Sequence, residues 1–536
     1  MSSEKDSCIP DELKNFVFDL HDSVRTSQIP SEQVNLYGRT FRELTAKYFE
    51  KSAWPSPQSI SDECGGDELF LALYKEITQR HLQSIIRPSP KDRVEGWHVY
   101  CALFDLILKH AAETSADQSI FILPDWTFDI LHEFLYQFQG FCQFRTTTFA
   151  NAAKYGPDGS NEGKKAPHHV TESIEILSNN RDAWAIEKVF SYLHRLVNVG
   201  VESPAFQYLA VFSSVTLSRL ECLLGDYTAS LDALTPVSDP KVVIGAPRGA
   251  EEDFKALTQE EVVNSVFSAK LSMAYHQGVC FLMLRRYRDA SRVLGDICVT
   301  MQRGFKSGEY KGVPGSDQFS KLYDRMMALL AIITHACPVH GLVEDSLAKT
   351  IRDKHGKQLS KIEAGEEGYE DLFIYACPKF VTPSTPQYEL ALTEGASAGP
   401  HGQDAYKLQV KHFMNEMANQ QTLRKLRSYM KLYTSISVDK LGRLVMDEDF
   451  VPLLVSYKHR MRQIENGKKG CDGDDASEAP VESNVGSVMD IHYFIKDDII
   501  HIDEAEKQNR FENYFMSQIS QSIDIKKDMD AISVNI

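Results

Sequence analysis

The spacing of apolar residues in the last hundred or so positions constrains the fold most, because it changes from helical to strand-like in a fixed order. Residues 423–436 predict a first helix whose face to be buried carries Leu423, Leu426, Tyr429, Met430 and Tyr433. Ser437 and Asp447 are suitable N-caps for a second and a third short helix, since their side chains can accept hydrogen bonds from the first turn. Three consecutive short helices are therefore expected.

A β-hairpin is expected after these helices. Residues 466–487 are rich in Gly, Asp and Ser, and residues 489–503 then alternate apolar and polar side chains around a polar turn at 496–498. The residues expected to line the faces of the hairpin, and to form a protein interface there with another subunit, are Tyr493, Ile495, Ile500 and Ile502. Three short helices followed by a hairpin form a winged-helix module, which we place at residues 406–503, with the hairpin as its wing.

The remaining residues, 504–536, are expected to form an amphipathic C-terminal helix. Its apolar stripe has four-residue spacing, and the residues expected to contact a partner are Phe511, Tyr514, Phe515, Ile519 and Ile523. A helix of this length is marginal alone in water, so it requires a surface to pack against. The sequence therefore predicts an inter-subunit helical bundle here.

The residues before the module are predicted to be helical almost throughout. Residues 1–170 are expected to form an N-terminal helical domain, in which 129–144 is a buried helix and 146–170 a polar loop. Residues 171–405 contain two similar units, each with a tyrosine (Tyr227, Tyr287) followed three residues later by a small residue. This spacing resembles tetratricopeptide hairpins, although the two units are not separated by a multiple of that repeat length. The whole chain is expected to be mainly α: a tetratricopeptide-like solenoid followed by the winged-helix module and a C-terminal helix.

Charge and hydropathy exclude several classes of protein. The net charge of −17 disfavours a chain that coats nucleic acid, and no run of about 18 apolar residues predicts a membrane span. The N-terminus lacks a basic start followed by an apolar stretch, and the ten cysteines form no CxxC pair. Reduced thiols and a cytoplasmic location are expected.

The sequence predicts no catalytic, cofactor-binding or metal-binding residues. Gly395 to Gly399 match G-x-S-x-G by letter, but the prolines around Ser397 do not fit the strand and helix that a nucleophile elbow requires. The histidine clusters lack metal-ligand spacing, and no phosphate-binding loop is present. We therefore expect a protein that is not an enzyme.

A basic cluster near the end of the third short helix leaves two interpretations open. Its residues are Lys458, Arg460, Arg462, Lys468 and Lys469. Helix-turn-helix proteins present groove-reading side chains at this place, but acidic residues follow within twenty positions and would repel a polyphosphate. A solvated helix face beside a protein interface is favoured over a backbone-only, salt-sensitive contact with structured RNA.

Helical repeats that lead into a winged helix and a terminal helix resemble the PCI-domain family of scaffold subunits, with the PCI region beginning at about residue 300. Seven runs along nearly the whole chain are similar, in the same order, to the L-subunit family of eukaryotic translation initiation factor three. These runs are 131–145, 223–234, 283–294, 375–383, 425–441, 453–461 and 490–502. The chain departs from that pattern in four polar stretches, at 146–168, 236–262, 390–403 and 466–487.

The resemblance implies a non-catalytic scaffold of the initiation factor complex. Its implied partners are the K subunit, other PCI subunits and the small ribosomal subunit, with no membrane and no cofactor. A PCI subunit of the proteasome lid or of the COP9 signalosome is the alternative within the same architecture. A winged-helix regulator that binds nucleic acid, and a hydrolase that uses Ser397, are alternatives of other classes.

Overall fold

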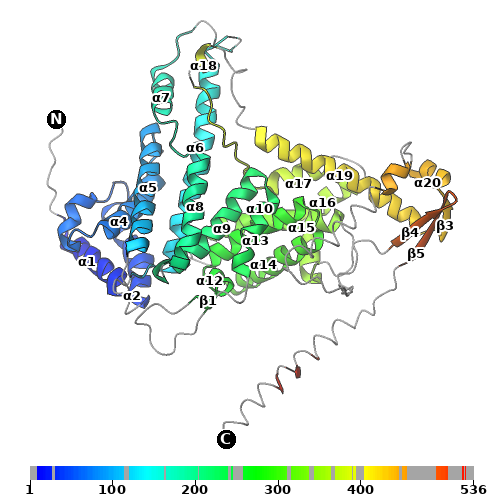
Figure 1. Cartoon of the computed structure of the whole chain (residues 1–536), viewed down its shortest axis with the longest axis horizontal. Helices are drawn as coiled ribbons and strands as arrows, with labels where there is room; N and C mark the ends of the chain where they lie inside the picture. Colours follow the sequence, from blue (N-terminus) through cyan, green and yellow to red (C-terminus); the bar gives the residue numbers. More distant parts are fainter. Residues whose placement is uncertain are drawn as a thin grey trace. The chain divides into compact units, whose positions relative to one another are not determined.

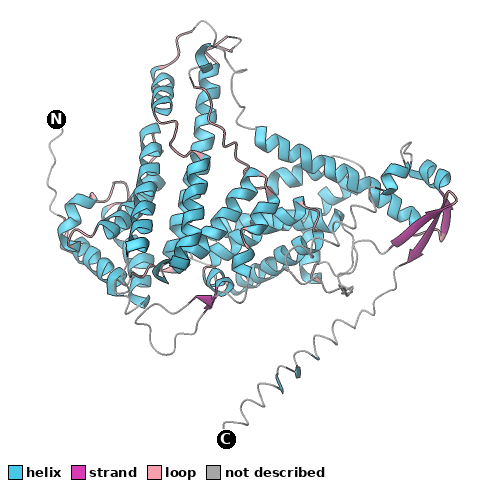
Figure 2. Cartoon of the chain, viewed as in Figure 1, coloured by secondary structure: helices cyan, strands magenta, loops and turns pink. Residues whose placement is uncertain are grey.

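The chain divides into two compact units in the computed structural model, Met1–Met414 and Asn415–Ile536. The structure describes residues 9–26, 30–113, 120–157, 159–161, 164–202, 204–238, 243–244, 257–310, 316–336, 343–363, 368–388, 390–393, 404–445, 450–455, 491–504, 519, 522–523 and 525–526. Where it is described, the first unit is helical nearly throughout, as predicted (Figure 1, Figure 2).

The helices of the first unit follow one another with short connections. Its first part contains α1 (Asp11–Thr26), α2 (Pro30–Asn35), the π-helix η1 (Leu36–Thr40), α3 (Phe41–Tyr48), the 3-10 helix η2 (Pro57–Cys64), α4 (Glu68–Ile85), α5 (Pro90–Glu113), α6 (Pro124–Ala153) and α7 (His168–Asn179). The next part contains α8 (Ile186–Glu202), the 3-10 helix η3 (Pro204–Phe206), α9 (Gln207–Leu224), α10 (Tyr227–Asp232), α11 (Thr235–Ser238), strands β1 (Val243–Ile244) and β2 (Leu257–Thr258), and α12 (Gln259–Ser265). The last part contains α13 (Phe267–Met283), α14 (Tyr287–Ser307), α15 (Ser316–Ala336), α16 (Asp345–Glu363), α17 (Gly368–Ala376), α18 (Leu390–Thr393) and α19 (Asp404–Met430), which continues into the second unit.

Helix α6 is the central buried element of the N-terminal part. The aromatic and aliphatic residues predicted to be buried along it are all at most 2% exposed, namely Leu131, Phe134, Leu135, Phe138 and Phe141. The prediction that a loop begins at residue 146 is wrong, because α6 continues to Ala153. The hydroxyl of Thr146 donates to the carbonyl of Cys142 at 3.0 Å, so this polar residue stays buried inside the helix with its hydrogen bond satisfied.

The two units with similar spacing form helix pairs that pack closely, as predicted. Tyr227 and Tyr287 are 7% and 2% exposed at the starts of α10 and α14. A Cβ atom added to Gly278 of α13 would lie 2.5 Å from Leu294 of α14, a distance that real side chains do not adopt. A larger residue at this position would therefore force the Leu294 side chain to shift where these two helices pack.

The chain returns to α6 after the repeats, a feature that the sequence did not predict. Residues 377–388, here called the return segment, contain no helix or strand apart from a turn at Tyr388. Val381 donates its amide to the carbonyl of Leu223, and Tyr388 is 1% exposed within the same apolar core as α6. Helix α18, which follows, packs beside α6 (Figure 1). Arg145 of α6 also donates to the carbonyl of Pro383, so the return segment contacts a residue 238 positions earlier in the sequence.

Asp67 links the first helix to the start of α4. Its carboxylate accepts two hydrogen bonds from Arg25 at 2.6 Å and one contact from His21 at 3.1 Å. The same side chain caps α4, since it accepts the amides of Leu69 and Phe70. Burial acts to raise the pKa of Asp67, but Arg25, the Phe70 amide and His21 together bring that pKa below its ordinary value.

The lowered pKa of Asp67 predicts a pH-dependent stability. In the unfolded chain the carboxyl binds its proton at a higher pH than in the folded chain, so folding is favoured above the unfolded pKa, near 4. This stabilisation is lost as the pH falls through the folded pKa. We expect Asp67→Asn to lower the free energy of unfolding by roughly 1–3 kcal/mol at pH 7, and by less at pH 3. Thermal unfolding followed by circular dichroism at both pH values checks this, and an equal loss at both would contradict it.

The second unit contains a three-stranded antiparallel sheet in the order β3-β5-β4, with α19 and α20 (Val438–Val445) before its hairpin. The strands are β3 (Ser435–Ser437), β4 (Ile491–Lys496) and β5 (Ile499–Glu504), and residues 450–455 are helical. The predicted helix 423–436 is therefore wrong at both ends: α19 begins at Asp404 and ends at Met430. Residues 435–437 form a strand instead, because β5 offers them an edge to pair with.

Candidate partner-binding module

The second unit is built on a small apolar core that matches the predicted winged helix. Its buried residues come from three helical segments and the sheet: Leu426, Met430, Ile436, Leu441, Phe450, Leu454, Tyr493 and Ile500. The amide of Lys440 lies 3.4 Å from the hydroxyl of Ser437, as expected for the predicted N-cap of the second helix. The three helical segments and the hairpin of the predicted winged helix therefore all contribute to one core.

The hairpin turns through two residues with left-handed backbones. Asp497 and Asp498 have φ values of 51° and 56°, and they connect Lys496 to its cross-strand partner Ile499. Two consecutive positive φ values are those of a type I′ turn, whose twist matches that of the flanking strands. Aspartate tolerates this conformation better than most residues, so the predicted polar turn fits its place.

One face of the hairpin packs on the module's own helices. Ile500 is completely buried, and Tyr493, which pairs with Ile502, donates its hydroxyl to the Leu454 carbonyl at 2.6 Å. Burial raises the pKa of Tyr493 to about 12. Of the four predicted wing residues, Ile495 is the most exposed, at 43%, while Ile502 is half-buried against the core.

The opposite face of the hairpin carries apolar side chains in solvent. Phe494 is 55% exposed and stacks on His501 directly across the strand pair, with ring centroids 5.0 Å apart. Ile499 on the same face is 40% exposed. Phe494 was not among the predicted wing residues. The available signal was the apolar run Tyr493-Phe494-Ile495, since a hairpin with one face in water would alternate strictly with polar residues.

Strand β4 also presents a free edge among the described strands. Ile502 donates its amide to Thr434 on the β3 side of β5. Because antiparallel bonds alternate, the backbone of Ile500 is directed to β3 as well, and the Ile495–Ile500 pair exchanges no backbone bonds. The N–H and C=O of Ile495 therefore point to the outer edge, where another strand can pair.

Two sets of predicted site residues lie wholly or partly outside the described residues. The basic cluster Lys458, Arg460, Arg462, Lys468 and Lys469 lies outside them, as do Phe511, Tyr514 and Phe515 of the C-terminal helix. Ile519 and Ile523 are described as helical and are 52% and 49% exposed. Both sets therefore remain predictions.

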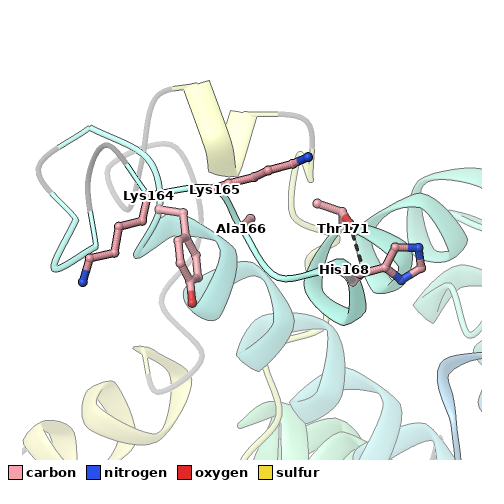
Figure 3. Close-up of a pocket in the computed structure, with 6 residues that line it drawn as sticks. Lys164, Lys165, Ala166, His168 and Thr171 are labelled. Carbon is pink, nitrogen blue, oxygen red and sulfur yellow. Dashed lines mark hydrogen bonds between the residues drawn. The ribbon is translucent and has the colours of Figure 1, made fainter.

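A hollow of about 600 Å³ lies at the connection between α6 and α7 in the first unit (Figure 3). It is lined by Tyr155, Lys164, Lys165, Ala166, His168 and Thr171. The Thr171 hydroxyl donates to the backbone carbonyl of His168 at 2.9 Å rather than to a ring nitrogen. These lining residues provide cations and an aromatic ring, but not a nucleophile in contact with a base.

The other side chains that could take part in catalysis are not brought together in the described residues. Ser397 lies outside the described residues, and the ring of His335 contacts the Tyr369 hydroxyl at 2.6 Å in the core. Within the described part of the chain, no three His, Cys, Asp or Glu side chains are grouped so that they could hold a metal ion. None of the described helices is both long and apolar enough to cross a bilayer.

Comparison with known proteins gives consistent matches along the chain. A family model described as RNA polymerase I-associated factor PAF67 matches residues 92–522. Eukaryotic translation initiation factor 3 subunit L from Nematostella vectensis is 29% identical over 98% of this chain and 94% of that protein. The subunit L proteins of Xenopus tropicalis and Homo sapiens are each 28% identical, over 98% and 97% of this chain and 92% and 90% of their own lengths.

Proposed function

The chain belongs to the family described as RNA polymerase I-associated factor PAF67, and from this membership we propose that it is the L subunit of eukaryotic translation initiation factor 3. The observation that carries the proposal is the alignment of named subunit L proteins over nearly the full length of both chains. The resemblance found in the sequence rests on runs spread over the same length. The helical repeats and the winged-helix module agree with that assignment.

We propose that the subunit is a non-catalytic scaffold in the cytoplasm. Its partners would be the K subunit, other PCI subunits and the small ribosomal subunit, with contacts made through the winged-helix module and the C-terminal helix. The outer edge at Ile495 and the exposed ring of Phe494 support this role, since both are surfaces that a protein partner can cover. A salt-sensitive contact of the basic cluster with RNA stays a prediction.

Membership of a large complex is the first test. We expect native sedimentation of a cell extract to place the chain in a particle far heavier than its own 60.6 kDa, together with other initiation-factor subunits identified by mass spectrometry. A chain found mainly as a free monomer would contradict the proposal. Co-sedimentation with the proteasome lid, the COP9 signalosome or RNA polymerase I in place of initiation factors would assign it to a different complex.

The C-terminal helix is the second test. Removal of all residues after Glu504, the last residue of β5, leaves the core of the module intact and should leave its stability unchanged. Incorporation into the complex should fall sharply, because the four-residue stripe from Phe511 to Ile523 could contribute several kcal/mol of apolar contact.

The outcomes of this truncation are separable. Circular dichroism of the purified truncated chain measures folding, and co-purification with initiation-factor subunits measures assembly. Loss of folding would show that the helix packs on its own module. Normal assembly would show that the helix is dispensable.

A further inference from the structure

The return segment carries two Thr-Pro dipeptides in non-helical backbone. These are Thr382-Pro383 and Thr385-Pro386, which follow the last helix of the repeats. Ser384 and Thr385 are exposed, whereas Thr382 is half-buried and its hydroxyl is buried without a partner among the described residues. Of the two threonines, only Thr385 presents its side chain to solvent.

A completely buried arginine lies beneath this segment. Arg145 of α6 is 0% exposed, and its Nη2 donates to the Pro383 carbonyl. Its Nη1 lies 3.5 Å from the Thr385 hydroxyl oxygen, a long hydrogen bond, and its Nε has no hydrogen-bond partner. Within the described residues no carboxylate pairs with this guanidinium.

A buried cation without an anion is costly, since neutral acceptors replace only part of its hydration. A guanidinium prefers oxygens that carry charge and that bind two of its donors at once. The Thr385 oxygen lies 3.5 Å from Nη1, so a charged group on that oxygen would be within reach of Arg145.

We propose that Thr385 is a phosphorylation site and that its phosphate binds Arg145, fastening the return segment to α6. The donor would be ATP and the catalyst a proline-directed protein kinase, a class that requires proline after the modified residue. The Thr385 oxygen forms a bond to the γ-phosphorus while the bond from that phosphorus to the bridging oxygen breaks. ADP leaves with the electron pair, and the hydroxyl proton passes to the base of the kinase.

The consequence is a tighter contact between segments far apart in the sequence. The phosphate brings three acceptor oxygens and a charge near −2 to a guanidinium that has only a carbonyl and a long hydroxyl contact. The residues around Pro383 should then open less often. This inference concerns the first unit and does not depend on the proposed function.

The test uses the full-length chain, a proline-directed kinase and ATP, with sites mapped by mass spectrometry. In the native chain we expect phosphate at Thr385. This phosphate should be missing from Thr385→Ala, whereas incorporation at Thr385 should be unchanged in the matched variant Thr382→Ala. A peptide of residues 379–391 serves as the unfolded reference. Phosphorylation of the peptide but not of the chain would overturn the proposal.

Two measurements on the phosphorylated chain test whether the phosphate binds Arg145. Hydrogen exchange of the amides at 381–388 should slow by roughly tenfold, the effect of one added charged hydrogen bond. The second pKa of the phosphate, followed by ³¹P NMR, should lie below that of the same phosphate in the peptide, and Arg145→Gln should bring the two together. If Arg145→Gln does not fold, the comparison of chain with peptide decides alone. Equal pKa values, or exchange that is unchanged or faster, would overturn the pairing with Arg145.

Discussion

Replacement of Ile500 by lysine is expected to unfold the winged-helix module while the helices of the first unit keep their structure. Ile500 is completely buried in the central strand β5, opposite Ile436 of β3 and Ile495 of β4. An ammonium group placed there would be surrounded by the apolar side chains of a core with only a few members. The cost of an unpaired buried charge, several kcal/mol, is comparable to the total stability of a small domain.

Hydrogen exchange of the full-length Ile500→Lys chain distinguishes unfolding of the winged-helix module alone from unfolding of the whole chain. Peptides from 491–504 should lose their protection, whereas peptides from α9 should keep theirs, and capture of PCI subunits should be lost. The matched control is Ile495→Lys, which adds the same charge at the cross-strand neighbour that is 43% exposed. We expect that variant to keep the protection of the module and to weaken partner capture only. Equal protection in both variants would show that β5 is not the centre of the module.

The order of the module was predictable because its signals are local. Period-two alternation, a polar turn and N-cap residues each act within a few positions, and the structure confirms the hairpin and the second helix. The turn is shorter than predicted, since Lys496 belongs to β4. Strand β3 could not be predicted in this way. Three residues carry no periodicity of their own, and Ser435 to Ser437 become a strand only through pairing with residues about 60 positions later.

Which side of the hairpin packs also depends on distant residues. The alternation treats Ile495 and Ile500 alike, yet only Ile500 is fully covered, because Ile495 lies one position from the end of its strand. Phe494 lies on the opposite face, where it is 55% exposed. The candidate binding surface thus combines Ile495, which the sequence predicted, with Phe494, which it did not.

The return segment shows the same limit in the first unit. Its prolines account for the absence of a helix after α17, since proline cannot continue a helix. The contact of Arg145 with Pro383 joins positions 238 residues apart, so no local pattern could reveal it. The one available indication was that Arg145 is the only arginine or lysine in α6.

A buried ion-pair network in the first unit provides the second large expected effect. Glu76 of α4 is 1% exposed and accepts two hydrogen bonds from Arg80, at 2.7 and 3.1 Å, and one from Tyr100 of α5 at 3.2 Å. Arg80 also contacts the hydroxyl of Tyr37 in the π-helix η1 at 2.9 Å, and that hydroxyl donates to Asp129 of α6 at 2.6 Å. Burial acts to lower the pKa of Arg80, but its anionic neighbours hold that pKa well above the ordinary value.

Arg80→Leu is therefore expected to lower the free energy of unfolding of the first unit by about 3–5 kcal/mol, because it leaves the Glu76 carboxylate buried without its cation. Arg39→Leu is the matched control: Arg39 makes an ion pair of the same i to i+4 spacing with Glu43, but both side chains are more than half exposed. Removing such a surface pair should change stability by less than about 0.5 kcal/mol. Urea unfolding of both variants, with hydrogen exchange of α4 to locate the transition, measures the difference. The double variant Arg80→Leu with Glu76→Leu should recover much of the loss, since the cost lies in the unpaired charge rather than in the missing bond. A loss that persists undiminished in the double variant would show instead that packing of the arginine stem accounts for the effect.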